Sequence, residues 1–450
     1  MRRLMIAAME SGGGKTTVTC ALLSLLRKQG IPVQAFKCGP DYIDPMYHTR
    51  ILGRPGHNLD LFLQGEQGVL QTLARSGSSF ALMEGAMGLF DGVGGTEQAS
   101  SYALAALTGT PVLLVVTPKG SALTLAAQIQ GLQGFHKPDM LAGLFLNRCK
   151  PSLAAYLAPI LKRETGLDVV GYLPPMEAAA LPSRHLGLVT AGEIDHLSRR
   201  FEEVAEQLQQ TLSAETLLAL SADAPLPVFQ PIASTEKATP IAVARDEAFC
   251  FYYQESLDAL ERSGAELRFF SPLHDSRLPG GIGGLYLGGG YPELYAEELS
   301  ANAAMRSAIG DAVSSGVPTI AECGGFLYLQ KTLQNESSQA FPMAGVFPGE
   351  GFATGRLQRF GYLHLCPEED SLLFRAGEQI PAHEFHYWDC TENGTSVLCE
   401  KPLSRRHWRC GYTSPTLYAA FPHLHLGGEL PLAKRFVNGA RTYLEALCTD

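Results

Sequence analysis

Several features that would place this chain in a simple class are absent. No Cys-x-x-Cys pair occurs among its 10 cysteines, which excludes a zinc ribbon, and scattered thiols are typical of the cytosol. The longest apolar stretch, around residues 104–116, contains Thr, Gly and Pro and is too short to span a bilayer. The first residues become rich in glycine too soon to predict a signal peptide. We therefore expect a soluble cytoplasmic protein.

An excess of basic residues is also absent. The chain has 35 Lys and Arg against 45 Asp and Glu, which gives a net charge of −10 at pH 7. Such a chain has no general field that attracts nucleic acid or anionic lipid, so we expect neither as a partner. Its hydrophobic fraction of 46% and charged fraction of 18% exclude wholesale disorder. An anionic ligand would need a local site.

The 450 residues predict two or three domains. Continuous apolar runs, each followed by a loop and a helix-like stretch, recur at 3–9, 80–83, 111–116 and 141–146. Such runs are typical of buried parallel strands in an α/β fold. Residues 213–239 are rich in Ala, Pro and Ser without a period and predict a linker, after which a new α/β series begins. We predict two α/β domains, 1–212 and 240–450.

A phosphate-binding loop is predicted near the N-terminus, between the first strand and the first helix. Small residues let backbone N–H groups close around phosphate oxygens, and the helix N-terminus adds its positive end. Lys15 would neutralise the β- and γ-phosphates, and the Thr16 hydroxyl would bind Mg²⁺. Met9 stands where the usual spacing has a further glycine. The predicted ATP-binding residues of the loop are Gly12, Gly13, Gly14, Lys15, Thr16 and Thr17.

Three further groups could serve the same site. Asp41 and Asp44, flanked by prolines, could hold a metal or orient a substrate, although taken alone they fit a surface turn better. Glu84 ends the strand at 80–84, where such folds place a carboxylate directed at a metal. Asn147 ends another strand and could read an adenine edge, but an ordinary turn residue is the alternative.

A second site is predicted around Cys323, which follows a buried strand and precedes Gly324 and Gly325. On a sharp strand-to-helix turn we expect an exposed thiol whose pKa is lowered by the helix N-terminus. His423 and His425 would share one face of a strand, where one could act as base and the other support it.

The glycine-rich segment 288–290 completes this second site. It follows a strand and could supply backbone N–H groups, from Gly289 and Gly290, to an oxyanion. A glycine turn alone would carry little weight. Together with a cysteine and distant histidines, it predicts nucleophilic acyl transfer.

The motifs together resemble those of the cobyrinic acid a,c-diamide synthase family. GGGKTT, KCGPDYIDP with the nearby His48, LPSRHLGL (181–188), GGGYPE, AECGG, HEFHY (383–387) and HLH occur in one order along essentially the whole chain. The resemblance implies an N-terminal domain similar to dethiobiotin synthetase and a C-terminal class I glutamine amidotransferase domain. It implies that ATP activates a carboxylate as an acyl phosphate and that ammonia from glutamine displaces the phosphate.

The resemblance also implies roles for single residues. Cys323 would be the nucleophile and His423 its base, while the third member of the triad stays open. Positions matching phosphate- and magnesium-handling residues are Lys15, Thr16, Asp41, Asp44 and Glu84. Among these we expect the metal at Thr16, Asp41 and Glu84. We expect the corrinoid at Asp44, Tyr42 and Ile43. The implied cofactor is Mg²⁺, and the implied substrates are ATP, L-glutamine and cobyrinic acid; a homodimer is one option for the assembly.

Other functions are compatible with some of these motifs. The same chemistry on hydrogenobyrinic acid or nickel sirohydrochlorin would use the same motifs, because neither activation of the carboxylate nor release of ammonia depends on the identity of the ring. A cobyric acid synthase type is disfavoured by KCGPDYIDP and the HLH pair. A P-loop partitioning-type ATPase with an inactive amidotransferase domain would need neither Cys323 nor His423.

Overall fold

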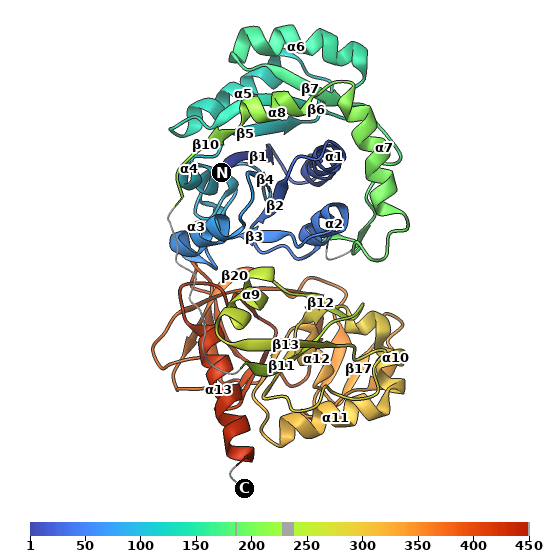
Figure 1. The fold of residues 1–450 in the computed structure, drawn as a ribbon, viewed down its shortest axis with the longest axis vertical. Helices are drawn as coiled ribbons and strands as arrows, with labels where there is room; N and C mark the ends of the chain where they lie inside the picture. Colours follow the sequence, from blue (N-terminus) through green and yellow to red (C-terminus); the bar gives the residue numbers. More distant parts are fainter. Residues whose placement is uncertain (185–186, 227–237, 449–450) are drawn as a thin grey trace. The chain divides into compact units, whose positions relative to one another are not determined.

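The computed structural model describes residues 1–184, 187–226 and 238–448, and the side chains of 183–188 are not among them. The chain divides into two compact units, Met1–Phe229 and Gln230–Asp450. Each has its own sheets and helices (Figure 1). The predicted α/β class, with an N-terminal parallel sheet, is confirmed.

The first unit is built on a parallel sheet with the strand order β3-β2-β4-β1-β5-β6-β7. Its strands are β1 (Arg2–Ala8), β2 (Val33–Cys38), β3 (His57–Leu59), β4 (Phe80–Glu84), β5 (Val112–Val116), β6 (Leu141–Asn147) and β7 (Val169–Leu173). The central strands are buried on both faces, as their continuous apolar sequences require. Their carboxyl ends meet at one edge, where loops after β1, β4 and β6 come together.

Helices cover both faces of this sheet (Figure 1). They are α1 (Lys15–Lys28), α2 (Ile43–Leu52), α3 (Gly65–Arg75), α4 (Ser101–Thr108), α5 (Leu123–Phe135), α6 (Pro151–Thr165), α7 (Leu197–Gln209) and α8 (Ala214–Leu220). Met5 and Ala7 of β1 face the core shared with α3 to α6. On the other face α1 packs between the sheet and α7, which explains why it is almost wholly buried. The helix that follows the glycine loop is therefore rigidly held.

Part of the segment predicted as a linker carries regular structure instead. Ser213 caps α8, its hydroxyl accepting a hydrogen bond from the Thr216 N–H at 3.2 Å, and Leu217 is buried. Residues 222–223 form β10, which pairs antiparallel with β1. Composition missed this because a seven-residue helix is too short to establish a period. Residues 227–237 of the predicted linker lie outside the described residues.

The second unit contains a mainly parallel sheet with the order β13-β11-β14-β16-β26-β25, in which only β25 runs antiparallel to its neighbour. These strands are β11 (Thr239–Ala244), β13 (Ala265–Phe270), β14 (Gly284–Leu287), β16 (Thr319–Glu322), β25 (Tyr412–Ser414) and β26 (Leu417–Ala420). The helices are α9 (Gln254–Arg262), α10 (Ala296–Ala301), α11 (Ala303–Ser314), α12 (Gly324–Tyr328) and α13 (Leu432–Leu447). Cys323 directly follows β16, and His423 follows the adjacent β26, so topology brings the predicted nucleophile and base to one edge.

Smaller sheets complete this unit. An antiparallel sheet has the order β24-β23-β20-β21-β27, another sheet has the order β18-β17-β19-β22, and β12 pairs with β15. Their strands are β12 (Phe249–Phe251), β15 (Gly289–Gly290), β17 (Thr332–Gln334), β18 (Ala340–Pro342), β19 (Glu350–Ala353), β20 (Arg359–Pro367), β21 (Ile380–His386), β22 (Trp388–Cys390), β23 (Val397–Glu400), β24 (His407–Cys410) and β27 (His423–Leu424). Across the described residues of both units, no helix combines the length and apolar character needed to cross a membrane.

Candidate active sites

The glycine loop of the first unit is shaped by contacts that only glycine permits. Gly14 has φ +92°, and a Cβ there would lie 1.9 Å from the Asn147 Nδ2 atom. The Asn147 amide donates to the Gly13 carbonyl at 3.2 Å, and the Thr117 hydroxyl donates to the same oxygen at 3.2 Å. Asn147 thus supports the loop in this structure, and its contact with an adenine stays a prediction.

Lys15 projects from the start of α1 into a buried setting. Its ammonium donates to the Met87 carbonyl at 2.5 Å and to the Glu10 carbonyl at 3.2 Å. Burial, followed by repulsion from Lys37, lowers the pKa of Lys15 to about 8. Both carbonyl partners are neutral, so the positive charge of Lys15 remains available to an anionic ligand such as a triphosphate.

Buried oxygens gather directly beside this lysine, around Glu84 at the end of β4. Glu84 Oε1 accepts from the Thr16 hydroxyl at 2.6 Å and from the Lys37 ammonium at 3.0 Å. Glu84 Oε2 lies 2.8 Å from His48 Nε2. Asp44 pairs with Lys37 and lies 3.3 Å from the Thr16 hydroxyl. The structure therefore joins Thr16, Glu84 and Asp44 in one centre, although we expected Asp44 at the substrate.

The charged groups of this centre shift one another's pKa values. Burial by itself would lower the pKa of Lys37, but Asp44 and Glu84 raise it well above its ordinary value. Burial would raise the pKa of Glu84, but Lys37 and His48 lower it. Burial, with the nearby carboxylates Asp41 and Glu84, raises the pKa of Asp44 well above its ordinary value. Two ammonium groups, Lys15 and Lys37, thus lie among the carboxyl groups of Asp44 and Glu84.

The oxygen atoms available suit Mg²⁺, which prefers hard oxygen ligands and usually keeps phosphate or water ligands as well. Among the described residues, no three His, Cys, Asp or Glu side chains converge as a metal cage. A metal here would therefore combine the Thr16 hydroxyl and a carboxylate with ligands from the nucleotide. Asp41, predicted as a ligand, uses Oδ1 to accept the N–H groups of Ile43 and Asp44 at the start of α2, and its Oδ2 lies 4.0 Å from Lys37 Nζ.

The two predicted substrate residues next to Asp41 differ in exposure. Tyr42 is partly exposed, whereas Ile43 is buried, with 6% of its surface accessible. Sequence reasoning also missed Lys37 and the role of His48 as a partner of Glu84. Lys37 had a usable signal, because a lysine inside the apolar strand VQAFKC must be paired when buried.

In the second unit, Cys323 lies on the predicted sharp turn. It has φ +47° and ψ −99°, an unusual conformation for a residue with a side chain. A Cβ at Gly324 would lie 2.9 Å from Pro292 Cδ, and a Cβ at Gly325 would lie 2.2 Å from the Leu287 carbonyl oxygen. The glycines are therefore required by the close approach of the turn to the strand and loop beside it.

The environment of the thiol differs from our expectation. Cys323 is 8% exposed rather than open to solvent. Burial, followed by the negative charges of Glu293 and Glu384, raises the pKa of the thiol well above its ordinary value. The N-terminus of α12 does lower the pKa through the Gly324 N–H, but this five-residue helix is outweighed. A base is thus needed to make the thiolate.

Each of the two predicted histidines pairs with its own glutamate. His423 Nδ1 lies 3.8 Å from Glu322 Oε2, and His425 Nε2 lies 3.8 Å from Glu255 Oε2. Only His423 belongs to β27; His425 follows it, with its ring centroid 5.0 Å from that of Tyr253. The two imidazoles are therefore held by different elements, β16 and α9, and the supporting role of His425 stays a prediction.

The glycine-rich segment reaches both catalytic elements. A Cβ at Gly289 would lie 2.5 Å from His423 Cε1, and the backbone N of Gly290 lies 3.0 Å from the place where a Gly324 Cβ would stand. The Gly325 N–H donates to the Gly288 carbonyl at 3.0 Å. This segment thus lies against the turn and the histidine, as an oxyanion site requires, although the assignment of its donors stays a prediction.

Most of the HEFHY segment, His383–His386, forms the end of β21 beside the predicted base. His383 is the register partner of His423, and burial lowers its pKa to about 3, so it is neutral. Glu384 Oε1 lies 2.8 Å from His386 Nε2. The His386 ring stacks on Phe421, with centroids 4.0 Å apart. These residues form part of the buried wall of the second unit.

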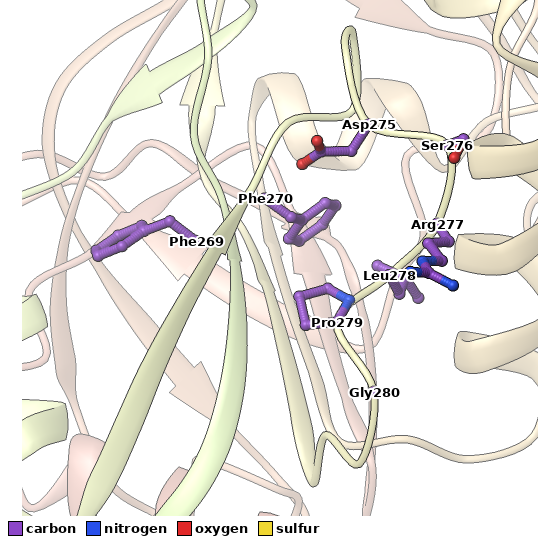
Figure 2. A pocket seen from close by; sticks show the side chains of 8 residues that line it. All are labelled: Phe269, Phe270, Asp275, Ser276, Arg277, Leu278, Pro279 and Gly280. Carbon is purple, nitrogen blue, oxygen red and sulfur yellow. The ribbon is translucent and has the colours of Figure 1, made fainter.

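A separate hollow of about 570 Å³ lies at the end of β13 (Figure 2). It is lined by Phe269, Phe270, Asp275, Ser276, Arg277, Leu278, Pro279 and Gly280. None of the predicted site residues lines it, so it belongs to neither candidate site.

Both units match models of known protein families. Residues 4–189 match the CobQ/CobB/MinD/ParA nucleotide binding domain, and residues 240–429 match the CobB/CobQ-like glutamine amidotransferase domain. The cobyrinate a,c-diamide synthase of Clostridium acetobutylicum is 39% identical over 443 residues, which are 97% of this chain and 100% of that protein. The chain belongs to the cobyrinate a,c-diamide synthase family.

Other members match to a similar extent. The proteins of that name from Salmonella typhimurium and Thermoplasma volcanium are 38% and 36% identical, each covering 98% of this chain and 98% of its own length. The predicted family and the pairing of a nucleotide-binding domain with a glutamine amidotransferase domain are thus confirmed. As a family member, the chain is a ligase that uses ATP and takes its amido group from glutamine.

Proposed function

We propose that this enzyme converts the a and c acetate groups of cobyrinic acid into amides. A carboxylate does not accept ammonia directly, so the γ-phosphoryl group of ATP is first transferred to it, giving an acyl phosphate and ADP. Ammonia then forms the C–N bond, and phosphate leaves. The observation that carries the proposal is that one chain holds both the Lys15–Thr16–Glu84 centre and the Cys323 turn.

The residues of the first unit prepare the phosphoryl transfer. Lys15, whose ammonium donates to the carbonyls of Met87 and Glu10, binds the β- and γ-phosphates. Thr16 and Glu84 present oxygens for Mg²⁺, which when bound offsets phosphate charge. Asp41 or Asp44 is a further metal or substrate group, and Tyr42 and the buried Ile43 lie on the corrinoid side. Asn147 keeps the glycine loop in shape.

The residues of the second unit release ammonia. The Cys323 thiolate attacks the carboxamide carbon of glutamine after His423 takes the thiol proton. Backbone N–H groups from Gly289 or Gly290 stabilise the oxyanion. His423 returns the proton to the leaving ammonia, and water then hydrolyses the glutamyl thioester to glutamate and free thiol.

Scattered thiols, none of them in a disulfide among the described residues, and small-molecule substrates favour a cytoplasmic enzyme. A homodimer is the assembly we propose to test by light scattering.

The decisive experiment measures glutamate release and product mass with ATP, Mg²⁺, glutamine and cobyrinic acid. In the wild type we expect glutamate and two successive mass decreases of about one dalton each, as hydroxyl is replaced by amino. Cys323→Ala should lose both. Cys390→Ala, which removes another buried thiol of the same unit, should keep both. Glutaminase activity without a change of cobyrinic acid would move the substrate to hydrogenobyrinic acid or another tetrapyrrole.

A further inference from the structure

When His423 acts as a base, its second ring nitrogen carries a proton, and among the described residues two glutamates lie within 4 Å of the histidine pair, at 3.8 Å each. In a cysteine–histidine pair, the imidazole becomes positively charged when it takes the thiol proton. A buried carboxylate at the other nitrogen stabilises that charge and selects the ring orientation. Glu322, at the end of β16, and Glu255, in the first turn of α9, are both buried, and each lies 3.8 Å from one of these histidines.

We propose that Glu322, the residue immediately before the nucleophile, is the positioning carboxylate for His423. Its Oε2 lies 3.8 Å from His423 Nδ1, while the Glu255 carboxylate faces His425 instead. This inference rests on the proposed roles of Cys323 and His423. A distance of 3.8 Å exceeds a hydrogen bond, but catalytic hydrogen bonds are often long without substrate and shorten when it binds.

Glu322 is held firmly enough to act in this way. The carboxylate is 1% exposed, and its Oε1 accepts the backbone N–H of Leu424 at 2.9 Å. Its Oε2 accepts the Tyr286 hydroxyl at 3.1 Å. Burial and the neighbouring Glu322 raise the pKa of Tyr286 well above its ordinary value, so the phenol stays protonated and donates. Both oxygens are thereby oriented by groups that do not take part in the reaction.

The same contacts fix the backbone that carries His423. The Leu424 N–H bond ties the residue after the histidine to Glu322, and the Tyr418 hydroxyl donates to the Pro422 carbonyl at 2.8 Å. The peptide groups on both sides of His423 are therefore tied to strands β16 and β26. Since Cys323 follows Glu322 directly, one strand end positions both the nucleophile and the carboxylate behind its base.

The test is Glu322→Gln, which keeps an acceptor for Leu424 N–H and the size of the side chain but removes the charge. We expect kcat for glutamine hydrolysis to fall about 100-fold or more, with a much smaller change in KM for glutamine. ATP-dependent amidation with ammonium chloride as the nitrogen source should stay within a few-fold of the wild type. If Glu322 had only a structural role, the substitution would not lower glutamine hydrolysis while leaving ammonia-dependent amidation nearly unchanged.

A spectroscopic measurement gives a second readout. In protein with ¹⁵N-labelled histidine, we expect a downfield Nδ1–H proton of His423, assigned by its loss in His423→Asn, to disappear or move upfield in Glu322→Gln. Glu378→Gln is the matched control, because it removes a charged carboxylate paired with Arg435 in the same unit and should leave kcat and the resonance unchanged.

The outcomes separate the inference from the function it rests on. Wild-type kcat in Glu322→Gln, or equal loss of glutamine- and ammonia-dependent amidation, overturns the role of Glu322. A larger loss of kcat in Glu255→Gln than in Glu322→Gln would assign the carboxylate to the His425 pair instead. Retained glutaminase activity in Cys323→Ala would contradict the proposed function itself.

Discussion

At the scale of single residues, the thiol of Cys323 shows how strongly burial can reverse a local expectation. A cysteine on a glycine-flanked turn at a helix N-terminus is typical of a lowered pKa. In the folded chain, apolar neighbours and the carboxylates of Glu293 and Glu384 raise it instead. In the proposed mechanism, Cys323 therefore stays a thiol in the free enzyme until His423 removes the proton.

This arrangement predicts how Cys323 reacts with iodoacetamide. Because only the thiolate reacts and the pKa of Cys323 lies well above the ordinary 9.0, its alkylation rate should keep rising beyond about pH 9 without a plateau. Peptide mass spectrometry can follow it against the exposed Cys448 in the same chain. A plateau of the Cys323 rate below pH 8 would contradict this.

Other residues show which functional groups can be recognised from a sequence pattern alone. The pattern around Lys15 and Thr16 located the phosphate loop, because its spacing of small and charged residues has few other uses. Lys37 and Glu322 were not recognised, since a buried lysine or glutamate gains its role only from partners that are distant in the chain. Those partners, Glu84 for Lys37 and His423 for Glu322, are brought near by strand order.

At the scale of elements, the turn between β16 and α12 depends on the absence of side chains at two positions. The Gly325 position lies against Leu287 of β14, and its backbone approaches more closely than any Cβ allows. This is a constraint of strand packing, although the sequence shows it only as a pair of glycines after a cysteine.

We expect Gly325→Ala to disturb this turn. The new Cβ would lie 2.2 Å from the Leu287 carbonyl oxygen, so the strand or the turn must move, at a cost of about 2–4 kcal/mol. The urea transition of the second unit should shift to lower concentration, and glutaminase activity should be lost. Gly280→Ala, where a Cβ meets nothing within 4 Å, is the control. Unchanged activity and midpoint in Gly325→Ala would disprove the constraint.

Short elements also occur in the segment that the sequence predicts as a linker. Its first part forms α8 and β10, because Leu217 is buried and residues 222–223 pair with Arg2 and Arg3 at the start of β1. Short elements of this kind draw their stability from tertiary contacts rather than from their own periodicity.

At the scale of the whole molecule, the residues proposed for the two halves of the reaction lie in separate units. Lys15, Thr16 and Glu84 all belong to the first unit, whereas Cys323 and His423 belong to the second. A substitution can therefore remove a residue of one chemical step and leave the residues of the other step in place.

We expect Lys15→Met to separate them. Without its charge, the loop loses the cation that offsets the phosphates, and ATP-dependent amidation should fall about 100-fold or more with either glutamine or ammonia. Basal glutamine hydrolysis, measured as glutamate release, should stay within a few-fold of the wild type. Thr17→Ser, a mild change in the same loop that keeps the hydroxyl, serves as the control. Parallel loss of both activities would refute the separation.

The sequence alone determined the α/β class, the two functional motifs and the family, because these depend on local spacing and on the alternation of apolar runs with helix-like stretches. Only the tertiary structure decided which groups meet. Asp44 rather than Asp41 lies beside Thr16, His423 and His425 face different glutamates, and Cys323 is buried. Charge pairing and desolvation act through space, and residues far apart along the chain become neighbours only when strands β2, β4, β16 and β26 end at common sheet edges.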